Sequence, residues 1–182
     1  MGQVKGTLFV DYVRMLRAKK DVDWARYLTP SDLEYIGKRI ISDEWYPMTT
    51  FERMGLAILA EVAEGDLRLV KEWGRMSIDW LCAVHPNLVS HGDPRESLMR
   101  FQVLRQSFFD YAALVMREIT DGEAKLVIAY GMSHRAEEAA SWQTLGFFER
   151  LLEVSGAKDV KIAFTSTSWD GGPNTTLEMS WT

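Results

Sequence analysis

The sequence predicts an α+β protein, in which a bundle of helices packs with a small antiparallel sheet. Two observations lead to this fold class. Through the first two thirds of the chain, apolar residues recur at intervals of three and four, the spacing of one helix face. From residue 121 onward, short runs of alternating apolar and polar residues are typical of strands. We expect five helices, then a strand, a helix and two strands, in one domain over 1–182 with a helical part at 1–120 and a strand-rich part at 121–182.

Composition limits the class of protein. Apolar side chains make up 47% of the 182 residues, enough to bury a sizeable core. A formal net charge of −5 argues against nucleic acid or an anionic membrane surface as the main partner. No run of about 18 apolar residues occurs, so we expect no membrane span, and the N-terminus lacks the apolar stretch of a signal peptide. Because Cys82 is the single cysteine, we expect a reduced, cytoplasmic protein without an intrachain disulfide.

The first two helices are predicted from apolar spacing and from a capping residue. Over 7–19, apolar residues share one helix face: Leu8, Phe9, Tyr12, Val13 and Leu16. Thr29 precedes Pro30, and a hydroxyl can cap free N–H groups while proline fits the first helical turn. We expect the second helix to run from there to about Ile41.

Capping residues also mark the third and fourth helices. Thr49 and Glu52 have the spacing of a capping box, which predicts that the third helix opens there and ends at Gly65. Asp66 is expected to cap a fourth helix, and Pro86 ends it because proline disfavours a helical residue before it. The apolar residues of this fourth helix form one stripe: Leu69, Val70, Trp73, Trp80, Leu81 and Val84.

The longest predicted helix comes next, followed by the strand-rich part. Asp93 starts this helix, and its apolar spacing continues to about Glu118. The elements after it are a strand, a helix and two strands, predicted at 124–131, 136–156, 158–169 and 175–181.

Four polar side chains follow the first predicted strand: Tyr130, Ser133, His134 and Arg135. They precede a helix N-terminus, which presents free N–H groups and a partial positive charge, so they are candidates for a clamp on a carboxylate or phosphate. In the alternative interpretation, Ser133 caps the helix and Arg135 pairs with Glu137 or Glu138. We favour the alternative, because a helix start needs a polar cap whatever the function.

Trp45 and Tyr46 are candidates for the lining of a ligand pocket, since pockets are mostly aromatic and aliphatic. They can equally form an apolar plug between the second and third helices, and we favour the plug.

A metal site is the second candidate that we consider. Zinc needs three or four ligands, and the available ones are Cys82, His85, His91 and Asp93. A buried cysteine with solvated loop histidines is the interpretation we prefer, so we predict no metal.

The sequence contains no motif for nucleophilic or phosphate chemistry. It lacks a Gly-x-Ser-x-Gly elbow, a phosphate loop and a Gly-x-Gly-x-x-Gly motif. Ser133 and His134 are adjacent, so their side chains diverge, which is poor geometry for a nucleophile and its base. Most of the glutamates on helices, a group that includes Glu137, fall beside arginines or lysines and are interpreted as solvated surface. We therefore predict that the protein is not an enzyme.

Residues 124–181 resemble the end of the haem-nitric-oxide-binding (H-NOX) and 4-vinyl-reductase superfamily. The resemblance is carried by Ser133 and Arg135 in the turn, by the 146–148 segment (Gly-Phe-Phe) of the long helix, and by a hairpin ending near Trp181. The segments 6–9 (Gly-Thr-Leu-Phe) and 45–47 (Trp-Tyr-Pro) fit more loosely. With its 73–75 segment (Trp-Gly-Arg), the chain is also similar to an uncharacterised myxobacterial family of the same superfamily.

This resemblance implies an H-NOX-like fold and a haem whose propionates are held by a Tyr-x-Ser-x-Arg motif. Here Ser133 and Arg135 keep their spacing, but Tyr130 is one residue too early, and such a shift on a strand turns a side chain to the opposite face. The resemblance also places the iron on a histidine of the long helix before the sheet. The predicted helix there contains no histidine or cysteine, and no tyrosine in its middle. Since iron without an axial ligand loses its main bond to the protein, we predict no haem and no other cofactor.

Two functions remain open. The first is a non-enzymatic sensor or regulatory signalling module that binds a small apolar or anionic molecule between its helical part and its sheet, or that has lost the ligand. The alternative is an interaction or scaffold domain that dimerises, similar to superfamily relatives in vesicle tethering. Its contact would be an exposed aromatic stripe or a free sheet edge at 175–181.

Overall fold

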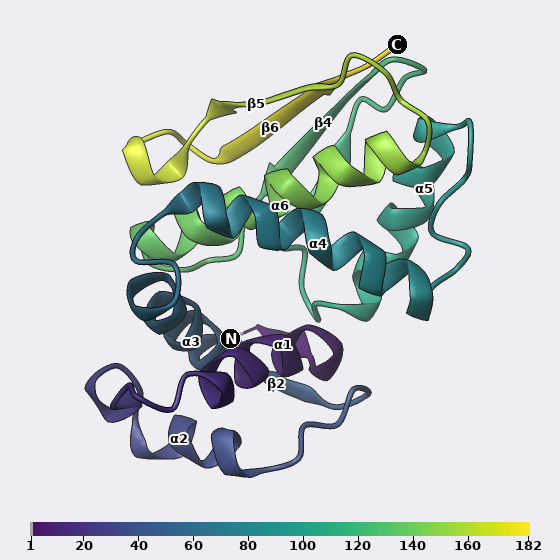
Figure 1. Ribbon diagram of the computed structural model, residues 1–182. Coiled ribbons are helices and arrows are strands. Elements are labelled where there is room, and N and C mark those ends of the chain that lie inside the picture. The colour runs from purple at the N-terminus through teal and green to yellow at the C-terminus, as the bar shows by residue number, and fades with distance from the viewer. Residues whose placement is uncertain (1) are drawn as a thin grey trace. The chain divides into compact units, whose positions relative to one another are not determined.

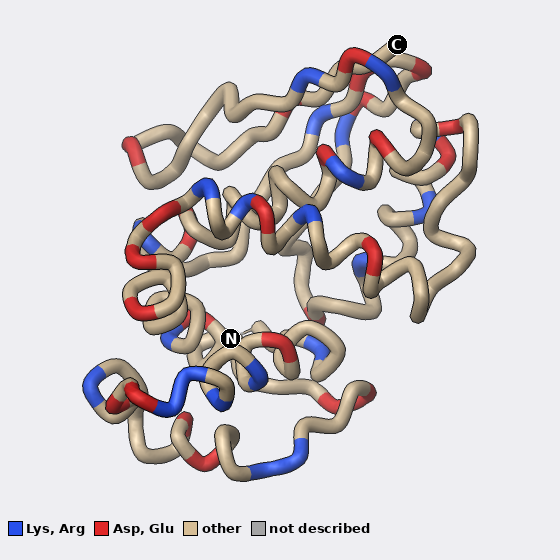
Figure 2. Tube along the Cα trace, viewed as in Figure 1, with Lys and Arg blue, Asp and Glu red and all other residues tan. Residues whose placement is uncertain are grey.

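The computed structural model describes residues 2–182, and the chain forms two compact units (Figure 1). Unit 1 consists of Met1–Leu67 with Gln106–Tyr111, and unit 2 consists of Arg68–Arg105 with Ala112–Thr182. Two helices that precede residue 105 therefore belong to the same unit as the four-stranded sheet. Acidic and basic residues are interspersed along the trace of both units (Figure 2).

Unit 1 is built from three helices and a two-stranded sheet. The antiparallel strands pair Val4 with Tyr46. Its elements are β1 (Gln3–Lys5), α1 (Gly6–Ala18), a 3-10 turn (Trp24–Arg26), α2 (Pro30–Gly37), β2 (Trp45–Pro47) and α3 (Met48–Glu61). The helix predicted over 7–19 is confirmed, whereas the second helix ends at Gly37 and does not reach Ile41.

The capping prediction is correct for α2 and wrong for α3. Thr29 Oγ1 accepts the N–H of Asp32, and the Asp32 carboxylate accepts the N–H of Thr29 at 2.9 Å, which completes a capping box. In α3, β2 runs straight into the helix, so that Thr49 already lies in its first turn. Within the described residues, no side chain caps α3, and the expected box with Glu52 does not form.

Asp32 fixes α2 to α3. Its fully buried carboxylate accepts two hydrogen bonds from Arg53, at 2.6 and 2.8 Å, and one from the Thr50 hydroxyl at 2.8 Å. Burial alone would raise the pKa of Asp32, but the hydrogen bonds from Arg53, Thr29 and Thr50 outweigh burial and hold the pKa well below its ordinary value. Beside this network the core of unit 1 is aromatic, and the Phe9 and Tyr46 rings stack 4.5 Å apart.

Unit 2 contains an antiparallel sheet with the strand order β3-β4-β6-β5. Its elements are α4 (Leu67–Val84), α5 (Pro94–Leu104), β3 (Leu114–Arg117), β4 (Glu123–Ile128), α6 (His134–Val154), β5 (Lys161–Ser166), a 3-10 turn (Ser168–Asp170) and β6 (Thr175–Ser180). A further 3-10 turn (Arg105–Ser107) follows α5, where the chain passes into the Gln106–Tyr111 segment of unit 1. β6 pairs with β4 on one side and with β5 on the other. The prediction of a free sheet edge at 175–181 is therefore wrong. The edges of the sheet are β3 and β5.

The prediction of one long helix from Asp93 to about Glu118 is also wrong for its second half. Asp93 caps α5 through the N–H of Glu96, but the helix ends at Leu104 and the chain returns as strand β3. Within β3 the burial alternates, as expected for a strand paired with β4. Pairing with a distant strand therefore overrides the apolar spacing that predicted a helix.

Helix α6 lies between the sheet and α4 (Figure 1). Trp142 on α6 meets Phe164 of β5 edge to face, with ring centroids 5.7 Å apart. On the other side, a Cβ at Gly74 of α4 would lie 1.9 Å from the Gln143 carbonyl oxygen. A Cβ at Gly146 would likewise lie 2.0 Å from a backbone oxygen of α4. The two helices therefore touch backbone to backbone at a pair of glycines.

Candidate functional site

The turn between β4 and α6 contains most of the predicted site residues. Gly131 has a φ of +76°, a left-handed conformation that glycine adopts without strain, and it reverses the chain before α6 begins at His134. Glu137, one turn into α6, reaches back over this segment. Its Oε1 accepts the N–H of Tyr130 at 2.8 Å, and its Oε2 accepts the N–H of Met132 at 2.9 Å. Glu137 is only 6% exposed, so the expectation that it is solvated is wrong.

Tyr130 points along α6 and away from the helix start. Its hydroxyl lies 2.6 Å from Thr144 Oγ1, and Thr144 donates its own hydrogen to the Ala140 carbonyl at 2.8 Å. Tyr130 is therefore the donor in the first of these bonds. Thr144 lies eleven residues after Ser133, which is roughly 16 Å along a helix. The structure does not bring the two hydroxyls together.

The other side chains of the turn are exposed. Arg135 donates to Glu138 Oε2 at 2.7 Å, an ion pair between partly exposed groups. Ser133 occupies the N-cap position of α6, but in the described structure its side chain makes no capping bond, so that part of the polar-turn interpretation is wrong. His134 is exposed in the first turn of the helix.

Trp45 and Tyr46 lie in unit 1, on opposite faces of β2. Tyr46 is buried against Phe9, and its hydroxyl accepts the N–H of Ile41 at 2.9 Å. Trp45 is 37% exposed, and the Lys5 ammonium lies 4.4 Å from the centroid of its ring. A cation held over an aromatic face is a modest surface interaction. The two aromatic side chains therefore have different surroundings and do not share a lining.

A buried polar stripe on α6 was not predicted from the sequence. Glu137, Ser141 and Thr144 follow one another at helical spacing, and all three are buried. Ser141 is fully buried, and its hydroxyl makes no hydrogen bond within the described part of the chain. The only signal in the sequence was the spacing of these three polar residues on a helix with many apolar neighbours.

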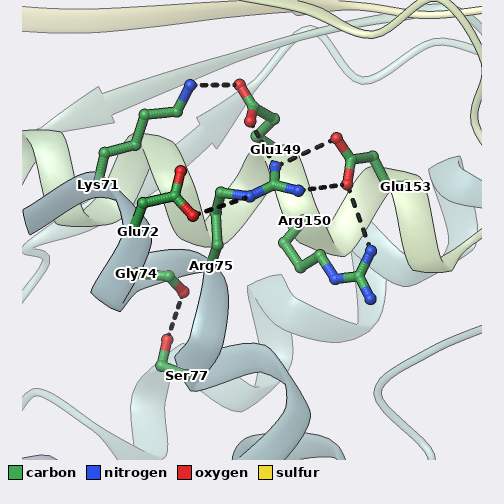
Figure 3. Close-up of polar contacts among 8 residues, drawn as sticks. All are labelled: Lys71, Glu72, Gly74, Arg75, Ser77, Glu149, Arg150 and Glu153. Carbon is green, nitrogen blue, oxygen red and sulfur yellow. Dashed lines mark hydrogen bonds and ion pairs between the residues drawn. The ribbon is translucent and has the colours of Figure 1, made fainter. Parts of the chain in front are cut away.

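A second polar cluster joins α4 to α6 beside the glycine contact (Figure 3). Arg75 binds Glu149, and it also binds Glu153 with hydrogen bonds of 2.8 and 3.1 Å. Lys71 pairs with Glu149 at 2.9 Å, and Arg150 pairs with Glu153 at 3.4 Å. The hydrogen bonds from Arg75 lower the pKa of Glu153 despite its partial burial. This alternation of charges fixes the rotation of α4 about α6.

The cysteine and the three histidines lie in or beside the helices of unit 2. His85 follows α4, His91 lies in the loop before α5, and burial raises the pKa of the Cys82 thiol. Among residues 2–182, no group of three histidine, cysteine, aspartate or glutamate side chains is positioned to hold a metal ion. No described helix has the length and apolar character needed to cross a membrane.

Known proteins resemble this chain in structure and not in sequence. No protein-family profile matches it, and no curated protein matches it. Among solved structures, matches over nearly the whole chain are H-NOX proteins, so the chain has an H-NOX-like α+β fold. This confirms the fold that the sequence resemblance implied.

Three of these structures illustrate the similarity. The Fe(II) unliganded H-NOX protein from K. algicida has a TM-score of 0.67 at 17% identity, covering 98% of this chain and 96% of that one. The S. oneidensis H-NOX protein in the Fe(II)NO ligation state has a TM-score of 0.62 at 14% identity, covering 98% and 99%. A mutant of T. tengcongensis H-NOX has a TM-score of 0.61 at 14% identity, covering 97% of both chains.

Proposed function

We propose that the protein is a non-enzymatic, cytoplasmic sensor or regulatory module with an H-NOX-like fold that holds no histidine-bound haem. The observation that carries this proposal is the placement of the possible iron ligands. Sequence resemblance locates the haem histidine on the helix before the sheet, and α5 with the segment up to β3 contains no histidine or cysteine. The three histidines lie at the end of α4, before α5 and at the start of α6.

Tyr111 is the one tyrosine in that segment, and a tyrosine is also a known haem ligand. Its ring is half-buried and lies against the backbone of unit 1, where a Cβ on Gly2 would lie 2.3 Å from it. The ring also meets Phe109 edge to face, with centroids 6.0 Å apart. Tyr111 is therefore held against Gly2 and Phe109, so the residues present do not fit the ligation that the resemblance implies.

The contacts made by the 130–135 turn favour an apolar ligand over an anionic one. Tyr130 donates to Thr144, Arg135 pairs with Glu138, and Glu137 occupies two backbone N–H groups. The Tyr130 hydroxyl, the Arg135 guanidinium and the two backbone N–H groups would each otherwise attract an anion. We therefore infer that the molecule sensed is small and apolar.

Haem loading tests the proposal. Protein purified from cells supplied with a haem precursor is expected to show no Soret absorbance. Its native mass spectrum is expected to contain the mass of the chain, alone or with a small apolar adduct. A Soret band with a haem-sized mass increment, retained after gel filtration, would overturn the proposal.

A second candidate function, a scaffold domain that dimerises, is favoured by one observation on unit 2. Apolar side chains lie exposed along one side of α4, seven and eight residues apart: Leu69, Met76 and Val84. Met76 is 66% exposed, Val84 49% and Leu69 38%, and apolar side chains that share one exposed helix side can form a contact with another protein surface. The same mass spectrum distinguishes this candidate, because a dimer without an adduct supports it.

A further inference from the structure

The turn before α6 has the geometry of an anion-binding site. Gly131 is left-handed, and the N–H groups of its two neighbours, Tyr130 and Met132, converge on the same side chain. Backbone N–H groups that converge around a left-handed residue form a concavity that attracts anions. The N-terminus of a 21-residue helix follows immediately and adds a partial positive charge.

An anion already occupies this concavity, and it belongs to the chain. Side chains on a helix lean toward its N-terminus, so Glu137 reaches back and places one carboxylate oxygen on each N–H group. A buried carboxylate is stable only when its oxygens accept hydrogen bonds, and these two N–H groups provide them. Ser141 lies one turn further along the same face, fully buried and without a hydrogen-bond partner in the described residues.

We propose that Glu137 is the resident anion of the 130–133 turn, an internal contact that excludes external carboxylates and phosphates and sets the path of the chain from β4 into α6. Removing its carboxylate leaves two N–H donors free to bind any small acid that fits the space. This inference shares the Glu137 contacts with the argument for an apolar ligand in the proposed function, but it concerns contacts inside unit 2 and does not depend on whether haem is bound, so haem loading and the experiment below can fail separately.

Chemical rescue of full-length variants tests the inference. In Glu137→Ala, the amides of Tyr130 and Met132 are expected to exchange with solvent about tenfold faster than in the parent protein, or more. Formate and acetate are expected to raise the Tm of this variant saturably, compared with chloride at equal ionic strength, and to restore protection of the same two amides. The parent protein is expected to respond equally to formate and chloride.

Two further variants make the result decisive. Glu137→Gln keeps the volume of the side chain but offers one acceptor oxygen, so the exchange of one of the two amides should accelerate even if the alanine variant does not fold. Glu138→Gln removes the neighbouring acid, which binds Arg135, and should leave the exchange of both amides and the response to formate unchanged. Unchanged exchange at Tyr130 and Met132 in both Glu137 variants would refute the proposal. So would saturable binding of formate at this turn in the parent protein.

Discussion

Asp32 and Glu137 are both acidic residues near the start of a helix, and each is buried because it binds groups that would otherwise lack partners. Asp32 accepts hydrogen bonds from a guanidinium, a hydroxyl and a backbone N–H, whereas Glu137 accepts two backbone N–H groups. An acidic residue at such a position in a sequence looks like exposed surface. Only the tertiary contacts distinguish a buried acid from a solvated one, so the sequence could not predict Glu137 as a site residue.

The low pKa of Asp32 gives a pH-dependent prediction. Its pKa in the folded state lies below the value in the unfolded chain, so folding favours the ionised carboxylate. The stabilisation is complete above the ordinary aspartate pKa of about 4 and is lost as the pH falls below that value. Asp32→Asn should lower the free energy of unfolding by about 2–4 kcal/mol at neutral pH.

Urea denaturation of the parent protein and of Asp32→Asn between pH 7 and pH 2 measures this effect. The difference between the two proteins should shrink below pH 4. As a control, Glu34→Gln removes an exposed acid of the same helix and should have little effect on stability at any pH. A difference that stays constant down to pH 2 would show that Asp32 is not held ionised by its partners.

At the scale of elements, α4 and α6 are joined by a backbone contact as well as by charges. Gly74 and Gly146 permit the close approach, and Arg75 then reaches both Glu149 and Glu153. A side chain at either glycine would push the helices apart and stretch these ion pairs. The packing of α4 on α6 is therefore sensitive even to alanine at either glycine.

Gly74→Ala is expected to lower the free energy of unfolding by about 1–3 kcal/mol, because its Cβ would overlap the Gln143 carbonyl oxygen. Gly37→Ala is the matched control. Nothing lies within 4 Å of a Cβ at Gly37, and alanine there is expected to be neutral or stabilising by up to about 1 kcal/mol. Chemical denaturation of both variants measures the change in the free energy of unfolding. Equal changes in the two variants would contradict the close approach of the helices.

Several elements could be predicted from the sequence and others could not. The first helix, the Thr29 cap, strand β4, helix α6 and the last two strands carry local signals, and all are present. Strand β3 was missed because its four residues extend an apolar pattern with helical spacing, and only pairing with β4 makes them a strand. Strands β1 and β2 have three residues each, too short for a period to be visible.

At the scale of the molecule, the fold is H-NOX-like, and in the turn before α6 Tyr130 binds Thr144 and Arg135 binds Glu138. An exposed apolar face on α4 then becomes the candidate for a contact between copies of the chain. Met76→Glu places a charge on that face and is expected to shift the protein to monomer in analytical ultracentrifugation, if the parent is a dimer. Val103→Glu, which places the same charge on an exposed apolar residue of α5, is the control and should leave the oligomeric state unchanged. A parent protein that sediments as a monomer at all concentrations would exclude the scaffold function.

The central position of β6 has a consequence for synthesis on the ribosome. Strands β4 and β5 do not pair with each other, and both wait for residues 175–180 to lie between them. Until those residues have been made and can pair, β4 keeps an open hydrogen-bonding edge and β5 has no partner strand. Unit 2 therefore cannot complete its sheet before residues 175–180 are available to pair, and a stop codon before residue 175 is expected to yield a chain prone to aggregate.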